Sequence, residues 1–203
     1  MPIDKATFFL VLFFLVLNLI LLLNFDFISK KINIFDDPDN RLKKHKKKTS
    51  LLGGSIIVLN IIVFFLINLL LKNTLIDFEL TKMISFLFII FSFYLVGIYD
   101  DIKKIIPKIK LLFIIFSSLM AILYDRDLGL NLVKISFIEK NYSLSHFSIP
   151  FTVLCFALLA NAFNMFDGID LQLILFSIFV FAIFLFKSSF MIFSCIILIN
   201  LFF

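Results

Sequence analysis

The chain has 203 residues, of which 62% are hydrophobic, and phenylalanine alone contributes 31 of them. Soluble domains are about 45–50% apolar, and one core in a chain of this length could not bury the excess. The composition therefore excludes an ordinary soluble domain and a disordered chain. The apolar runs are continuous rather than alternating, which argues against a membrane β-barrel. The remaining class is an all-α, polytopic membrane protein.

Seven apolar stretches are long enough to cross, or nearly cross, a hydrocarbon core of about 30 Å. No internal repeat is visible, so we expect residues 1–203 to form a single membrane domain. The segment 125–147 has mixed polarity and is expected to form a short hairpin or an interfacial helix. The seven expected spans are Phe8–Ile28, Leu51–Leu71, Met83–Tyr99, Leu111–Tyr124, Ser148–Phe166, Leu171–Phe186 and Ser189–Phe203.

The distribution of Lys and Arg predicts the orientation, because cytoplasmic loops carry an excess of both. If the segment after the first span is cytoplasmic, 12 of the 19 basic residues lie inside and 7 lie outside. The N-terminus is then outside, and loops 29–50, 100–110 and 167–170 face the cytoplasm. All the concentrated polar chemistry falls on this one side of the membrane.

The first polar cluster lies in the long loop 29–50 and in the start of the next span. Its lysine run, 43–48, is interpreted either as a phosphate site or as an anchor for anionic lipid head groups. Gly53 and Gly54 open a membrane helix, where free N–H groups favour an anion and glycine permits close approach. Close packing of two helices explains the glycine pair equally well.

The second cluster is Asp100-Asp101 at the inner end of the third span, followed by four lysines. Adjacent residues on a helix point about 100° apart, so the two carboxylates cannot serve one ligand identically. One of them could contact a metal ion while the other contacts a different group. The alternative is a solvated pair that simply ends a span.

The third cluster comprises Asn161, Asn164 and Asp167, spaced i, i+3, i+6, with Asp170 following. On a helix these three side chains spread over about 120° and rise about 9 Å. Amides inside an apolar span are costly unless they meet partners or line a wet cavity. Asparagine contacts between helices are the structural alternative.

Carboxylates suit Mg²⁺, and lysines suit phosphates. Clusters of both on one membrane face predict phosphoryl transfer between a soluble phosphorylated donor and a lipid, in which positioning and charge neutralisation carry most of the catalysis.

Three motifs resemble those of the polyprenyl-phosphate N-acetylhexosamine-1-phosphate transferases. The segment 161–170 is similar to the Asn/Asp signature of this family, and 97–101 with 107–111 to its aspartate pair and following lysine. Asp36-x-Pro38, Arg41, His45 and the Gly53-Gly54 pair are similar to its first cytoplasmic motif. The resemblance implies a bacterial inner-membrane enzyme of cell-wall or lipopolysaccharide synthesis.

The implied reaction moves a sugar 1-phosphate from a UDP-N-acetylhexosamine to undecaprenyl phosphate, with Mg²⁺ or Mn²⁺ as cofactor. No nucleic acid is implied as a partner, and a homodimer is compatible with the resemblance. Asp100 would deprotonate or orient the lipid phosphate, and Lys110 would hold a phosphate. The implied catalytic residues are Asp100, Asp101 and Asp167; the metal ligands are Asp101, Asn164 and Asp167; and the substrate-binding residues are Arg41, His45, Gly53, Gly54, Lys110, Asn161 and Asp170.

Two further cytoplasmic motifs of the family, Gly-Asp-x-Gly-Ser and a histidine loop, do not occur in the sequence. We therefore expect the chain to correspond to about the first two-thirds of the family domain and to have little or no transferase activity by itself. A degenerate protein that binds prenyl phosphate without turnover is an alternative. A small transporter or scaffold fits less well, because the polar residues cluster at one interface rather than in mid-membrane.

Overall fold

The computed structural model describes residues 5–32, 35–36, 49–50, 52–72, 75–76, 79–103, 105–135, 140–166, 172–186 and 191–202, and most of them are helical. The expected all-α class is therefore confirmed. Two short antiparallel strand pairs accompany the helices: β1 (Phe35–Asp36) with β2 (Thr49–Ser50), and β3 (Leu132–Lys134) with β4 (Asn141–Ser143). The helices are α1 (Lys5–Leu23), α2 (Phe25–Ile32), α3 (Leu52–Leu70), α4 (Leu80–Lys103), α5 (Pro107–Tyr124), α6 (Ser148–Phe166), α7 (Gln172–Phe184) and α8 (Met191–Phe202), with 3-10 turns η1 (Arg126–Leu128) and η2 (Ser145–Phe147).

Four helical segments in the described part of the chain are long and apolar enough to cross a bilayer. They are α3, α4, α5 and the continuous segment Ser145–Met165, which covers η2 and nearly all of α6. The bent pair of α1 and α2 could supply a fifth span. Helices α7 and α8 are apolar but have only 13 and 12 residues, so the expected total of seven crossings stays a prediction. The chain is a multi-pass helical membrane protein.

The first expected span, Phe8–Ile28, is bent rather than straight. Helix α1 ends at Leu23, and α2 leaves it at an angle of 62°. At the break the Asn24 side chain donates to the Ile20 carbonyl at 2.8 Å, and the backbone N–H of Asn24 donates to the same oxygen at 3.2 Å. Beyond the break α2 carries charged residues, which favour the membrane interface over its apolar interior.

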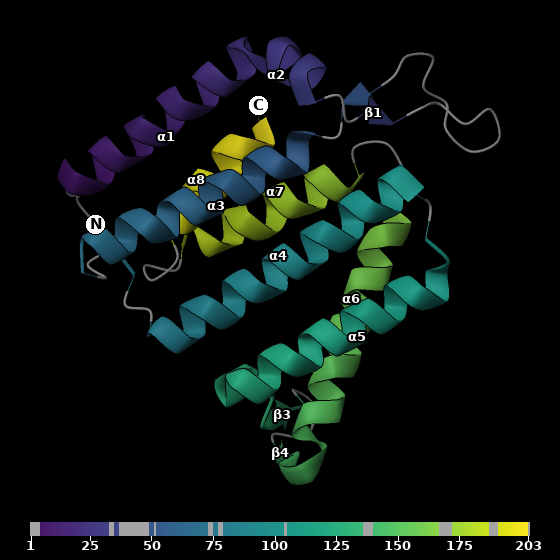
Figure 1. Ribbon diagram of the computed structural model, residues 1–203. Helices are drawn as coiled ribbons and strands as arrows, with labels where there is room; N and C mark the ends of the chain where they lie inside the picture. Colours follow the sequence, from purple (N-terminus) through teal and green to yellow (C-terminus); the bar gives the residue numbers. More distant parts are fainter. Residues whose placement is uncertain are drawn as a thin grey trace. The chain divides into compact units, whose positions relative to one another are not determined.

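The chain divides into two compact units. Unit 1 comprises 1–77 and 171–203, which contain α1–α3, α7, α8 and the β1–β2 pair. Unit 2 comprises 78–170, which contain α4–α6 and the β3–β4 hairpin (Figure 1). Whether the two units form the expected single domain stays a prediction.

Three asparagines connect α1, α3 and α8 inside unit 1. The Asn60 side-chain nitrogen lies 3.0 Å from the Asn18 side-chain oxygen and 2.7 Å from that of Asn200. Asn60 is fully buried and Asn18 is 3% exposed. Each amide nitrogen also donates to the carbonyl one turn earlier in its own helix. Because polar groups in an apolar interior need partners, this asparagine triad fixes how the three helices pack.

Replacing Asn60 with alanine is expected to lower the free energy of unfolding by about 1–2 kcal/mol, since two partner amides lose their contacts. Detergent-induced unfolding followed by circular dichroism measures the change. Asn24→Ala is the matched control, because Asn24 is exposed and its side chain donates to the Ile20 carbonyl, one turn earlier in its own stretch of chain. Equal stability of Asn60→Ala and Asn24→Ala would contradict the role assigned to the triad.

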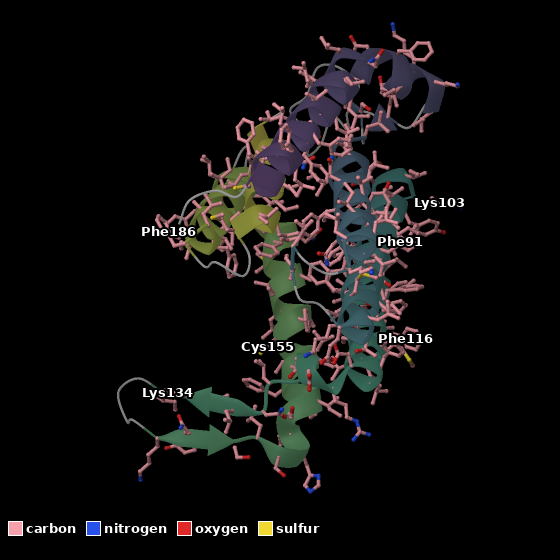
Figure 2. All side chains as sticks on the ribbon, turned by 90° about the vertical axis from the view of Figure 1, so that its left-hand side faces the viewer. Phe91, Lys103, Phe116, Lys134, Cys155 and Phe186 are labelled. Atoms are coloured by element: carbon pink, nitrogen blue, oxygen red, sulfur yellow. The ribbon has the colours of Figure 1, made fainter. Side chains whose placement is uncertain are left out.

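Unit 2 is a three-helix arrangement in which α5 packs against both α4 and α6. The β3–β4 hairpin, with Val133 paired to Tyr142, confirms the expectation that residues 125–147 contain a short hairpin. Lys134 on this hairpin and Lys103 at the end of α4 lie at opposite ends of the unit (Figure 2). Phe91 and Phe116 are 50% and 56% exposed, as apolar side chains that face lipid are.

Polar contacts hold α4 and α5 together at the hairpin end of unit 2. Asp125, which ends α5, accepts hydrogen bonds from the Ser85 hydroxyl at 3.0 Å and from the backbone N–H of Asp127 at 3.1 Å. The Asp127 carboxylate pairs with Lys82 of α4 at 3.0 Å. With this end fixed, the two rigid helices determine where their other ends lie, and the candidate site is there.

Candidate functional site

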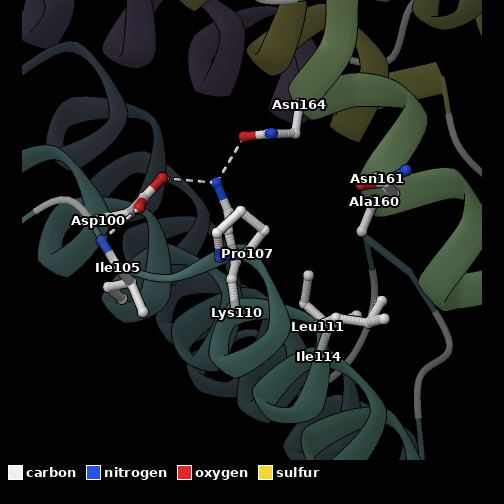
Figure 3. Close-up of a pocket in the computed structure, with 9 residues that line it drawn as sticks. All are labelled: Asp100, Ile105, Pro107, Lys110, Leu111, Ile114, Ala160, Asn161 and Asn164. Carbon is white, nitrogen blue, oxygen red and sulfur yellow. Dashed lines mark hydrogen bonds and ion pairs between the residues drawn. The ribbon is translucent and has the colours of Figure 1, made fainter.

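A pocket of about 90 Å³ lies where the end of α4, the start of α5 and the end of α6 meet in unit 2 (Figure 3). This is room for several water molecules or for a group the size of a phosphate. Both polar and apolar side chains line the pocket. The polar residues are Asp100, Lys110, Asn161 and Asn164, and the apolar ones are Ile105, Pro107, Leu111, Ile114 and Ala160.

Asp100 lies in the last turn of α4, where its negative charge opposes the helix dipole. Two contacts compensate for this. Its Oδ1 atom accepts a hydrogen bond from the backbone N–H of Ile105 at 3.0 Å, and its Oδ2 atom lies 2.8 Å from the Lys110 ammonium. Pro107 starts α5 directly after this turn, which brings Lys110 into the first turn of α5. The tight connection therefore places carboxylate and ammonium face to face.

The Lys110 ammonium also donates a hydrogen bond to the side-chain oxygen of Asn164 on α6 (Figure 3). One lysine thus joins groups from α4 and α6. The side chains of Lys110 and Asp100 are 19% and 26% exposed, so the ion pair is sheltered but reachable from solvent. In such surroundings charge-assisted hydrogen bonds are stronger than those on an open surface.

The other lysines of the second cluster lie differently. Lys103 lies over the ring of Tyr99, with 5.2 Å between the ammonium and the ring centroid. Lys108 is exposed, and Lys104 lies outside the described residues. Among the described lysines of this cluster, Lys110 is therefore the one that lines the pocket.

The structure brings together four of the residues singled out from the sequence: Asp100, Lys110, Asn161 and Asn164. Asp101 is exposed and is not among the described residues that line the pocket, as expected for a neighbour turned by about 100°. The catalytic and binding roles expected for these five residues stay predictions. Four further candidate residues lie outside the described part of the chain, and these are Arg41, His45, Asp167 and Asp170.

Gly53 and Gly54 lie in the first turn of α3, in unit 1, and both are exposed. A Cβ atom added at Gly53 would meet nothing within 4 Å among the described residues. Close helix packing, one of the two interpretations of the glycine pair, is therefore not seen at Gly53. Approach of an anion to this helix start stays a prediction.

The described residues contain no group of three or more His, Cys, Asp or Glu side chains placed to hold a metal ion. The pocket nevertheless has the oxygen ligands that Mg²⁺ and Mn²⁺ prefer, a carboxylate from Asp100 and an amide oxygen from Asn164. Both already surround a cation, the Lys110 ammonium. Because Mg²⁺ usually binds through one or two protein carboxylates and completes its shell with water and phosphate, this donor set fits it.

Sequence reasoning did not find the pairing of Asp100 with Lys110, because each was assigned to a phosphate separately. The signal for it was Pro107, which predicts a helix start and places Lys110 one turn into that helix. The asparagine triad was also missed. Its signal was the presence of asparagines inside three mostly apolar stretches, among them those at 18, 60 and 200.

Comparison with known proteins decides the family. The sequence profile described as Glycosyl transferase family 4 matches residues 83–202, which include every polar residue of the pocket. The chain belongs to glycosyl transferase family 4. The observed motif resemblance thus agrees with a match over more than half of the chain.

Two curated relatives of this family 4 chain carry names that describe their reactions. A probable undecaprenyl-phosphate N-acetylglucosaminyl 1-phosphate transferase of Bacillus subtilis (strain 168) is 28% identical over 143 residues, 70% of this chain and 37% of the relative. A phospho-N-acetylmuramoyl-pentapeptide-transferase of Clostridium novyi (strain NT) is 30% identical over 141 residues, 63% of this chain and 41% of the relative. The matched stretch therefore spans less than half of either relative. No solved structure matches the chain significantly.

Proposed function

We propose that this chain acts in the transfer of a sugar 1-phosphate, of the N-acetylhexosamine type, from a UDP-sugar to undecaprenyl phosphate. The products are a lipid diphosphate sugar and UMP. The observation that supports this most is the convergence of Asp100, Lys110 and Asn164 in one pocket within the family-matched segment. Groups suited to a phosphate and groups suited to a hard cation thus face each other, as transfer between two phosphates needs.

In the proposed reaction an oxygen of the lipid phosphate attacks the phosphorus that carries the sugar. The bond from this phosphorus to the bridging oxygen breaks, and UMP leaves with the electron pair. Asp100 is well placed to hold the attacking phosphate in line or to accept its remaining proton, since Ile105 fixes one carboxylate oxygen. Lys110 would hold phosphate oxygens on the other side. Positioning and charge neutralisation supply most of the catalysis in such transfers.

A divalent cation, Mg²⁺ or Mn²⁺, would neutralise the charge that builds up on the phosphates. Asp100 and Asn164 would hold it, together with Asp101 and Asp167 as the motif resemblance implies. The apolar residues that line the pocket, among them Leu111 and Ile114, suit the first carbons of a prenyl chain.

We further propose that the pocket faces the cytoplasm of a bacterial inner membrane, as the 12 to 7 split of Lys and Arg predicts. Single cysteines replacing Asn40 and Asn131, in a chain whose Cys155 and Cys195 are replaced by serine, test this in intact cells. An impermeant maleimide is expected to label position 131 and to leave position 40 unlabelled until the membrane is opened. Labelling of position 40 from outside would contradict the orientation.

A radiolabel assay tests the proposed function. Membranes containing the chain are incubated with labelled UDP-N-acetylglucosamine, undecaprenyl phosphate and Mg²⁺, and the lipid fraction is counted. Because the match covers 37% of the Bacillus relative, which is named for N-acetylglucosaminyl 1-phosphate transfer, the assay also uses a chimera in which the rest of that relative follows the chain. We expect the chimera to label lipid. A chimera that is folded but inactive, beside an active parent relative, would contradict the proposal and favour binding without turnover.

A further inference from the structure

The position of the Lys110 ammonium is unusual for a residue whose expected partner is a substrate phosphate. It lies 2.8 Å from Asp100 Oδ2 and donates to the Asn164 side-chain oxygen, so both of its described partners are protein oxygens. These oxygens come from two different helices, α4 and α6. The lysine therefore occupies the point at which the carboxylate and the amide converge.

The same two oxygens are the ones that a divalent cation would use. A carboxylate and an amide oxygen are typical ligands of Mg²⁺, at 2.0–2.1 Å, and both now face an ammonium group instead. An ammonium and a divalent cation repel each other strongly at such distances in a half-buried pocket. Without an anion between them they cannot share these ligands, so one must leave before the other binds.

The Lys110 side chain is suited to moving out of the pocket. Its charge is carried on a flexible four-carbon chain with rotatable bonds, and the Lys110 side chain is 19% exposed, so a path to solvent exists. The Asp100 carboxylate is more firmly held, because the Ile105 N–H fixes its other oxygen from within the turn. Displacement would thus move the lysine and leave the carboxylate in place.

We propose that Lys110 is a placeholder for the divalent cation. Before substrate binds, it neutralises Asp100 and keeps α4 and α6 in register, and it thereby weakens metal binding until a substrate phosphate accepts the ammonium. Metal and phosphate then bind with positive coupling, and each raises the affinity for the other by the same factor. This inference rests on the proposed function, because it takes the pocket to be the site where metal and phosphate meet.

Binding of Mn²⁺ to the whole chain in detergent micelles tests the placeholder directly, with free Mn²⁺ measured by electron paramagnetic resonance. Without phosphate, Lys110→Met is expected to bind Mn²⁺ about 10-fold more tightly than the unmodified chain, within the usual range of coupling between sites. Inorganic phosphate is expected to reduce this difference in Mn²⁺ affinity, since the Lys110 ammonium of the unmodified chain then has another partner. Lys108→Met, an exposed lysine on the same helix, is the matched control and should bind as the unmodified chain does.

Two results would overturn the placeholder. One is an equal or weaker affinity of Lys110→Met for Mn²⁺, which would make Lys110 a phosphate ligand or a support for Asp100 alone. The other is tight Mn²⁺ binding by the double variant that combines Lys110→Met with Asp100→Asn. Such binding would show that the ion binds elsewhere. Lys110→Gln provides a second variant if Lys110→Met does not fold. Because no turnover is measured, an inactive chimera would overturn the proposed function without changing this result.

Discussion

Replacing Asp100 with asparagine is expected to lower lipid labelling by the chimera by about 10²–10³-fold, the loss commonly seen when one group that stabilises transition-state charge is removed. Asparagine keeps the shape of the side chain and an oxygen that can accept the Ile105 N–H at the end of α4. It removes the charge that faces Lys110 at 2.8 Å. The variant thus separates the charge of Asp100 from its part in the turn between α4 and α5.

Asp127→Asn is the matched control for Asp100→Asn. Asp127 also pairs with a lysine, Lys82, at 3.0 Å. That pair is at the other end of α4, since Lys82 and Asp100 are 18 residues apart, or about 27 Å along a helix. We expect Asp127→Asn to retain most of the activity. Similar losses in both variants would mean that ion pairs support the fold generally and that Asp100 has no special role in transfer.

Replacing Asn164 with leucine is expected to lower transfer by about 10²-fold, because the pocket loses the amide oxygen that would hold the divalent cation, and this cation neutralises the charge that builds up on the phosphates. The loss should appear mainly in kcat if Asn164 acts on the transition state, and in KM if it only binds substrate. Asn164→Asp keeps an oxygen at the same place and should recover part of the activity. Radiolabel transfer at several donor concentrations separates these cases.

Asn141→Leu controls for Asn164→Leu, since Asn141 is an exposed amide on β4 at the hairpin end of unit 2. It should label lipid as the unmodified chimera does. Full activity of Asn164→Leu would show that Asn164 of α6 has no part in transfer. Asp100 and Lys110 would then be interpreted as a structural ion pair.

The helices could be predicted well from the sequence, because long apolar runs directly specify helices in a membrane. The expected span Ser148–Phe166 has the bounds of α6, and Leu51–Leu71 differs from α3 by one residue at each end. The bend after Leu23 was not predicted, because hydropathy averages over a window and does not detect a single side chain such as Asn24 that competes for a backbone carbonyl.

The candidate site could be predicted only as a set of residues on one side of the membrane. Spacing along α6 places Asn161 and Asn164 on neighbouring parts of its surface, since helical periodicity is local. Pro107 marks the start of α5, but which lysine reaches both Asp100 and Asn164 depends on how α5 packs against α4 and α6, and this packing does not follow from periodicity. The contact between Lys110 and Asn164, 54 residues apart in sequence, is of this tertiary kind. The asparagine triad in unit 1 was missed for the same reason.

The most direct test of the account is a doubly labelled donor, UDP-N-acetylglucosamine with tritium in the sugar and ³²P in the phosphate next to it. The account predicts that the chimera moves both labels to the lipid in equal amounts, releases UMP, and loses both when Asp100 is replaced by asparagine. Tritium in the lipid without ³²P would show transfer of the sugar alone, with UDP as the leaving group. That result would contradict sugar 1-phosphate transfer at the pocket of Asp100, Lys110 and Asn164.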